Sequence, residues 1–204
     1  GIGNGLSIVI ARAYGAGDKK LLKRSVAASL VIGLVVTMII MIFSKIFLYP
    51  LLKVLHTPAN IIEESYSYIS TITIFVGVMF AYNLLAGLLR AIGNSLMPLV
   101  FLIISSVINV ILDLVFIGKF NMGIKGAAVA TVIAQGISAV LCLIYIVKKC
   151  KILIPDKNCF KLDRGLYGEL VGQGLSMGFM MSIVSAGTII LQSAINSLGY
   201  LIIA

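Results

Sequence analysis

The sequence predicts an all-α protein, a polytopic bundle of transmembrane helices, and three observations support this prediction. The 204-residue chain is 60% hydrophobic and only 11% charged, with a mean hydropathy of +1.14. Apolar runs of about 20 residues, the length that crosses a bilayer, follow one another along the chain. No run alternates apolar and polar residues, and only helices or closed barrels satisfy their backbone hydrogen bonds in lipid.

We expect about five complete membrane helices and the end of a sixth. Residues 1–14 are predicted to end a helix that Gly15–Asp18 closes, because glycine commonly follows a helix C-terminus. The complete helices are predicted by five apolar runs: Ser25–Ser44, Ser65–Leu89, Leu99–Gly118, Gly126–Val147 and Leu170–Ala204. The last run has no charge and predicts a long tilted helix ending near Ser197–Gly199. Both ends of the chain are apolar and the first residue is not methionine, so we expect a piece of a longer protein.

The connections between these helices carry turn signals. A stretch from Tyr49-Pro50 to Thr57-Pro58 is predicted to lie outside, at the membrane interface. Arg90–Ser95 predicts a tight turn, and Pro98 suits the first turn of the helix that follows. Lys148–Arg164 is the longest and most polar connection, and its composition is typical of a linker between two bundles.

The basic residues predict the orientation of the chain. Segment Arg12–Arg24 holds five of the 16 Lys and Arg residues, Lys148–Arg164 holds six, and Arg90 lies on the same side. The four others are on the opposite side: Lys45, Lys53, Lys119 and Lys125. Cytoplasmic loops carry an excess of Lys and Arg, so the first side is predicted to be cytoplasmic. This topology, with contact to anionic lipid headgroups, accounts for the net charge of +9 without nucleic-acid binding.

Asp113 is the one carboxylate inside the apolar run Leu99–Gly118. A charge in hydrocarbon is costly, about 2.5–3.5 kcal/mol on insertion scales, so such residues usually face a protein interior or a water-filled cavity. Asn109 lies four residues earlier, on the same helical face. Together they predict a site for a coupling ion or a proton. A structural hydrogen bond between helices is the alternative, and it stays open at this point.

Other kinds of site find little support. The spacing of the three cysteines matches no zinc motif, and His56 is predicted on the opposite side of the membrane from Cys150 and Cys159. Gly172, Gly174 and Gly178 are followed by apolar residues and preceded by no strand, which favours close helix packing over a nucleotide loop. Nothing in the sequence indicates a cofactor or covalent catalysis, so we do not expect an enzyme.

Four segments resemble the MATE family, the multidrug and toxic compound extrusion transporters. Residues Leu88–Pro98 are similar to the cytoplasmic turn after that family's fourth helix, and Asn109–Phe116 to its fifth helix. Residues Met122–Thr131 resemble the entry to the sixth helix, and Ala13–Asp18 the end of the second. The order and spacing of these segments agree with the family over nearly the whole chain.

The resemblance implies a transporter of 12 helices in two lobes, of which this chain covers about helices 2 to 7. It divides the chain into a partial N-terminal lobe over residues 1–147, a cytoplasmic inter-lobe linker over residues 148–168, and the first helix of the C-terminal lobe over residues 169–204. The remaining half of its own full-length chain is then a partner of this segment.

The resemblance also implies the site residues. Asn109, Asp113 and Thr131 match the family's cation site, and their oxygen atoms would suit Na⁺, although Asp113 could take up a proton instead. Three further polar residues are predicted to line the substrate cavity: Asn83, Gln192 and Asn196.

The function implied is a secondary active antiporter of the cell inner (plasma) membrane, exporting lipophilic or cationic organic compounds in exchange for Na⁺ or H⁺. Two alternatives remain. A lipid-linked oligosaccharide flippase of the related superfamily would need a cationic cavity, and these helices place no Lys or Arg at mid-membrane. In a non-transporting membrane scaffold, Asp113 would only pack.

Overall fold

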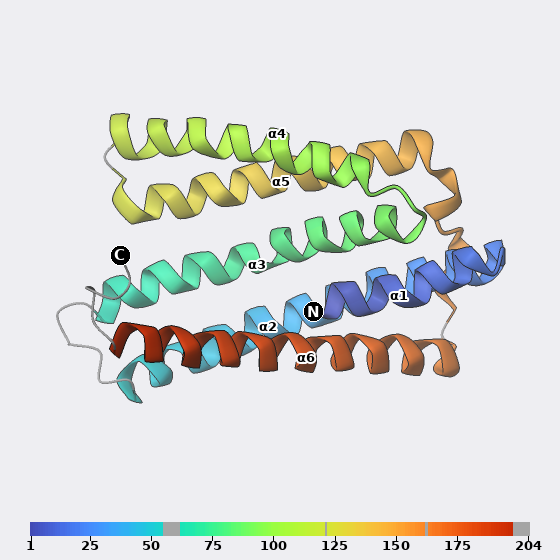
Figure 1. The fold of residues 1–204 in the computed structure, drawn as a ribbon, viewed down its shortest axis with the longest axis horizontal. Helices are drawn as coiled ribbons and strands as arrows, with labels where there is room; N and C mark the ends of the chain where they lie inside the picture. Colours follow the sequence, from blue (N-terminus) through green and yellow to red (C-terminus); the bar gives the residue numbers. More distant parts are fainter. Residues whose placement is uncertain (55–61, 121, 162, 198–204) are drawn as a thin grey trace.

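The computed structural model describes residues 1–54, 62–120, 122–161 and 163–197, and this part of the chain is almost entirely helical (Figure 1). Its six α-helices are α1 (Ile2–Gly15), α2 (Lys19–Val54), α3 (Ile62–Ala91), α4 (Leu96–Asp113), α5 (Gly123–Lys149) and α6 (Arg164–Ser197). The described residues contain no strand, so the all-α prediction is confirmed. Within the described residues, four helical segments are long and apolar enough to cross a membrane: Lys19–Phe43, Leu96–Lys119, Lys125–Lys149 and Arg164–Gln192.

The helices run alternately up and down the long axis of the molecule (Figure 1). The connections α1–α2, α3–α4 and α5–α6 lie at one end, and the described ends of the other connections lie at the opposite end. The segments Arg12–Arg24 and Lys148–Arg164, together with Arg90, therefore share one end, which we call the basic end. This arrangement agrees with the sidedness that the charge distribution predicts.

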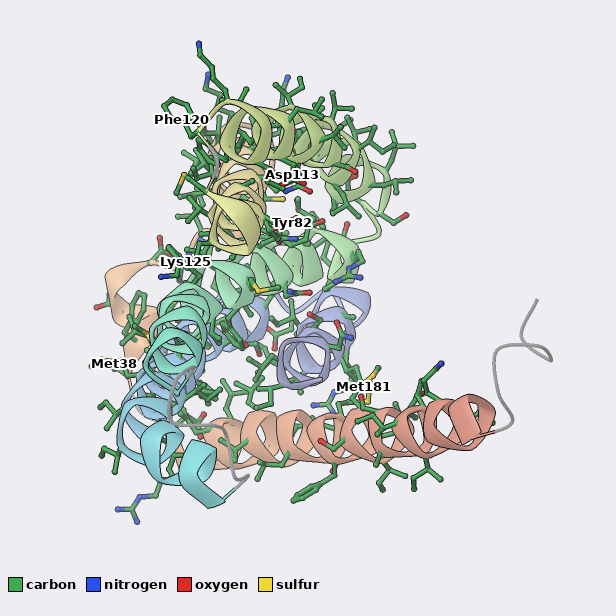
Figure 2. The ribbon with its side chains drawn as sticks, turned by 90° about the vertical axis from the view of Figure 1, so that its left-hand side faces the viewer. Met38, Tyr82, Asp113, Phe120, Lys125 and Met181 are labelled. Carbon is green, nitrogen blue, oxygen red and sulfur yellow. The ribbon has the colours of Figure 1, made fainter. Side chains whose placement is uncertain are left out.

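Helix α3 lies in the middle of the molecule (Figures 1 and 2). It packs against α1 and α2 on one side and against α5 on the other, while α4 packs on α5 and α6 packs on α1. Two clusters of buried side chains form the core. One contains Ile10, Leu22, Leu89 and Cys142, and the other contains Leu6 with further residues of α1, α2, α3 and α6.

Helices α4 and α6 bury few of their apolar side chains. Leu99, Ile103 and Val107 of α4 are exposed, and so are Phe179 and Ile183 of α6. In water such surfaces would be unstable, but lipid tails are as apolar as these side chains. The two helices therefore present broad faces suited to lipid or to further helices.

Helix α2 extends beyond its predicted end. The expectation of a separate interfacial stretch from Tyr49-Pro50 is wrong at its start, because α2 continues as one helix to Val54. The sequence stays apolar through this region, and proline is tolerated in membrane helices where neighbouring groups satisfy the freed carbonyl. The rest of the predicted stretch, residues 55–58, lies outside the described residues.

Helix α6 begins at Arg164, where the predicted connection Lys148–Arg164 ends and before residue 169, the bound that the family resemblance implies. Asp163 precedes the helix, and its Oδ1 accepts hydrogen bonds from the backbone N–H groups of Gly165 and Leu166, at 3.2 and 3.5 Å. An aspartate in this position satisfies backbone donors that would otherwise lack partners at a helix start. Two short 3₁₀ turns, Lys151–Leu153 and Lys157–Phe160, occupy the linker before it.

Candidate coupling site and cavity

Asn109 of α4 and Thr131 of α5 meet across the interface of these two helices. The Asn109 Nδ2 donates a hydrogen bond of 3.3 Å to the Thr131 Oγ1. The Thr131 hydroxyl in turn donates to the carbonyl oxygen of Ala127, at 2.9 Å. This contact uses the amide nitrogen of Asn109 and not its side-chain oxygen.

Asp113 is the last residue of α4, one turn beyond Asn109. The backbone changes there to a π-helical turn, Leu114–Lys119, a form found frequently at functional sites. Figure 2 shows Asp113 on the side of α4 that faces α5 and α3. Its Oδ1 is buried and has no hydrogen-bond partner among the described residues. An unpartnered buried acceptor costs about 1–3 kcal/mol.

Gln135 is a polar residue of this interface that sequence reasoning missed. Its Oε1 is buried and, within the described part of the chain, also lacks a hydrogen-bond partner. Gln135 lies one turn from Thr131 on α5, and Ser138 follows with its hydroxyl donating to the Phe101 carbonyl oxygen of α4 at 3.0 Å. The spacing of Thr131, Gln135 and Ser138 places all three on one helical face. Helical spacing, which places Asn109 and Asp113 on one face, would also have identified Gln135 and Ser138 beside Thr131 in the sequence.

A cavity of about 670 Å³ lies on the other side of α3, between α1, α2, α3 and α6. Its polar lining residues are Asn4, Asn83, Ser182 and Ser185, and no charged side chain lines it among the described residues. Figure 2 shows Met181, another lining residue, on the face of α6 that is turned toward α1.

The three residues predicted for the substrate cavity are placed differently. Asn83 lines this cavity, and its Nδ2 donates to the Met79 carbonyl oxygen at 2.8 Å. Gln192 is exposed on α6 and does not belong to the lining. The side chain of Asn196 lies outside the described part of the structure.

Glycines bring the backbones of α1 and α6 into contact. This contact lies at the end of the cavity that is nearer to the basic end. A Cβ atom at Gly5 would collide with the Gln173 carbonyl oxygen and lie 2.7 Å from the Gly174 Cα. A Cβ at Gly1 would lie 2.7 Å from the Gly178 Cα. Both helices therefore contribute a GxxxG pair, the spacing that lets membrane helices approach closely.

Three glycines of α6 are predicted to allow close helix packing, and the structure separates them. Gly174 and Gly178 pack against α1 as expected, whereas a Cβ at Gly172 would meet nothing within 4 Å.

The described residues form three ion pairs at the basic end, one between α1 and α6 and two between α2 and the linker. Arg12 of α1 pairs with Glu169 of α6. The Lys23 Nζ lies 2.8 Å from the Asp156 Oδ2 in the linker.

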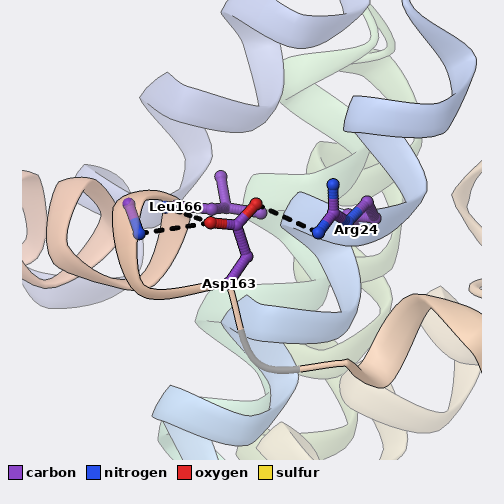
Figure 3. A network of polar contacts seen from close by, with 4 residues as sticks. Arg24, Asp163 and Leu166 are labelled. Atoms are coloured by element: carbon purple, nitrogen blue, oxygen red, sulfur yellow. Dashed lines mark hydrogen bonds and ion pairs between the residues drawn. The ribbon is translucent and has the colours of Figure 1, made fainter.

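The third ion pair combines with the start of α6 (Figure 3). The Arg24 Nη2 lies 3.0 Å from the Asp163 Oδ2, while the other oxygen of Asp163 caps α6. On α6, the residues that line the cavity begin at Gly178, so Gly174 lies nearer to the basic end than the cavity does. The glycine contact and the ion pairs therefore stand between the cavity and the basic end.

Comparisons with known proteins agree with this architecture. The sequence model of the family described as MatE matches residues 1–115. The chain is 32% identical over 98% of its length to the "Probable multidrug resistance protein YoeA" of Bacillus subtilis (strain 168), and covers 44% of that protein. It is 24% identical over 92% of its length to the "Multidrug export protein MepA" of Staphylococcus aureus (strain NCTC 8325 / PS 47), covering 42% of it.

Solved structures show the same fold. "Crystal structure of MATE in the straight conformation" superposes with a TM-score of 0.85 at 22% identity, over 97% of this chain and 44% of that one. "Inward-facing conformation of a multidrug resistance MATE family transporter of the MOP superfamily" gives a TM-score of 0.78 at 23% identity, over 85% of this chain and 40% of that one.

The fold and these similarities define the chain as part of an all-α, polytopic membrane protein. It belongs to the MatE family, which confirms the resemblance found in its sequence. The chain spans less than half the length of the relatives described above.

Proposed function

We propose that this chain supplies a partial N-terminal lobe, the inter-lobe linker and the first helix of the C-terminal lobe of a secondary active antiporter. The antiporter exports lipophilic organic cations across the plasma membrane in exchange for Na⁺ or H⁺. The observation that carries the proposal is the buried Oδ1 of Asp113, which has no partner within the described structure and lies beside the Asn109–Thr131 pair.

Occupation of this site changes the charge of the α4–α5 interface. A proton on Asp113 or a Na⁺ held by Asp113 and Asn109 would neutralise the half-buried carboxylate. A ligand shifts a conformational equilibrium only by its difference in affinity for the two states. Loading of the site therefore favours the arrangement of α4 and α5 in which the carboxylate is most enclosed.

Helix α3 connects α4 to the cavity, through a contact at the end of α4 opposite to Asp113. The Tyr82 hydroxyl donates to the Pro98 carbonyl oxygen of α4, at 3.4 Å, and the next residue, Asn83, lines the cavity. A displacement of α4 as a whole would thus reach the cavity through two adjacent residues of α3, Tyr82 and Asn83. The cavity offers amide, hydroxyl and thioether groups on an apolar wall, which suits a lipophilic organic molecule.

Export requires the contact between α1 and α6 to open and close. In the present arrangement the Gly5–Gly174 contact and the Arg12–Glu169 pair separate the cavity from the basic end. Alternating access in such transporters moves one bundle against the other. Separation of α6 from α1 would open the cavity toward the cytoplasm.

The flippase alternative finds less support in the cavity. A pyrophosphate headgroup would need cationic side chains, and the lining contains none. The scaffold alternative makes a different prediction for Asp113, which the following experiment tests.

The test replaces Asp113 with asparagine in the full-length protein and measures efflux of ethidium, a lipophilic cation, normalised to folded protein. Asp113→Asn keeps the size of the side chain but removes the titratable charge, so coupled efflux should be abolished while membrane insertion is retained. Asp18→Asn is the matched control, because it makes the same chemical change at an exposed helix cap. Asn109→Ala and Thr131→Ala each remove one neutral ligand and should weaken efflux less.

Two results would count against the proposal. Full coupled efflux by Asp113→Asn would show that this carboxylate is not the coupling group. Normal efflux per folded molecule with a lower melting temperature would instead support the scaffold alternative.

A further inference from the structure

A second cavity, of about 620 Å³, lies at the basic end between the start of α2 and the linker. Its lining residues are Lys20, Arg24, Asp156, Asn158, Cys159 and Lys161. It shares no residue with the cavity between α1, α2, α3 and α6, and the transport cycle proposed above does not use it.

The charges of this cavity are unbalanced. Arg24 is paired with Asp163, and Asp156 is paired with Lys23. Among the described residues, Lys20 and Lys161 make no ion pair, although both line the cavity. The cavity therefore holds two uncompensated ammonium groups, which makes it suited to an anion.

The position of the cavity narrows the identity of that anion. Lys20 is the second residue of α2, and the membrane-capable part of this helix begins at Lys19. The cavity thus lies at the boundary between the apolar span and the polar linker, at the depth of lipid headgroups. Cytoplasmic leaflets are rich in anionic lipids, and basic pockets between helices on that side bind their headgroups.

We propose that this cavity binds the phosphodiester of an anionic phospholipid headgroup in the cytoplasmic leaflet. The ammonium groups of Lys20 and Lys161 donate hydrogen bonds to the phosphate oxygens, and the Asn158 amide supplies a further donor. A glycerol headgroup can donate its hydroxyls to the Asp156 carboxylate, which remains an acceptor while paired with Lys23. A bound headgroup connects α2 to the linker and covers the half-buried Cys159.

The experiment compares binding of dioleoylphosphatidylglycerol and dioleoylphosphatidylcholine to the purified full-length protein by native mass spectrometry. The test variant carries Lys20→Gln and Lys161→Gln. The matched control carries Lys119→Gln and Lys125→Gln, which remove two exposed cations at the opposite end of the molecule. Each basic residue near an anionic membrane surface contributes about fivefold, so the test variant should bind phosphatidylglycerol about 30-fold more weakly.

Alkylation of Cys159 gives a second readout. Phosphatidylglycerol should slow alkylation in the original protein and in the control variant, but not in the test variant. Phosphatidylcholine and inorganic phosphate should leave the rate unchanged, and continued protection of the buried Cys142 shows that the variants are folded.

Equal loss of phosphatidylglycerol binding in both double variants would overturn the proposal, because the effect would then follow net charge alone. Protection of Cys159 by inorganic phosphate but not by phosphatidylglycerol would also overturn it, since the cavity would then bind a soluble anion.

Discussion

Replacing Gly5 with alanine tests whether α1 and α6 are held at backbone contact. The new Cβ would collide with the Gln173 carbonyl oxygen and lie 2.7 Å from the Gly174 Cα. Both obstacles are backbone atoms, so no side-chain rotation can relieve the clash and the helices must separate. Overpacking of this kind costs about 1–3 kcal/mol.

The matched control is Gly172→Ala on α6. A Cβ at Gly172 meets nothing within 4 Å, so this change carries only the helix-propensity gain of alanine over glycine, about 1 kcal/mol. Gly5→Ala receives the same gain, and the propensity term cancels when the two variants are compared. Gly5→Ala should therefore be less stable than Gly172→Ala by about 1–3 kcal/mol.

The assay is equilibrium unfolding of the full-length protein in mixed detergent micelles, followed by circular dichroism. Disulfide cross-linking of cysteines placed on α1 and α6 would report the separation of the helices directly. Equal stability of the two alanine variants would refute the reasoning, because it would show that α1 and α6 do not meet at Gly5.

Three further predictions concern the basic end. Arg12→Glu should lower the free energy of unfolding by up to about 1 kcal/mol, the value typical of a partly exposed ion pair. Adding Glu169→Arg should restore the free energy of unfolding, because the two charges are then exchanged and can pair again. A double variant no more stable than Arg12→Glu alone would exclude the ion pair. Asp163→Ala removes the cap of α6 as well as the ion pair with Arg24, and should cost about 1–2 kcal/mol. Asp163→Asn keeps the cap and should cost less in the same unfolding assay. Burial raises the pKa of the Cys150 thiol, so less of it is thiolate near neutral pH. In a single-cysteine protein, its alkylation rate should rise with pH around a midpoint above that of an ordinary cysteine, and a midpoint at or below the ordinary value would contradict the burial.

Part of the candidate site could be predicted from the sequence. An Asp in an apolar run is conspicuous because hydrocarbon excludes charge, and the amide one turn away follows from helical spacing. Thr131 came only from the family resemblance, and the structure places its hydroxyl against the Asn109 amide. Gln135 was within reach of the same spacing rule, but its burial depends on how closely α4 approaches α5, which no local pattern encodes.

The sequence by itself determined the class of this protein, the order of its helices and the end that carries the basic residues. These properties depend on the length of the apolar runs and on the positions of the charged residues, and both can be read from the linear chain. Helix α2 continues beyond Pro50, past its predicted end, because the sequence stays apolar there. Helix α6 starts at Arg164, before the bound at residue 169, because Asp163 caps its first turn.

Only the tertiary structure decided which helices meet. The glycines of α6 are plain in the sequence, but their partner, the Gly1–Gly5 pair of α1, is not. Nor does the sequence separate Gly174, which packs, from Gly172, which does not. The physical reason is that lipid tails are as apolar as leucine, so hydrophobicity cannot choose between helix partners in a membrane. Shape and a few polar contacts choose instead, and they exist only when two helices are side by side.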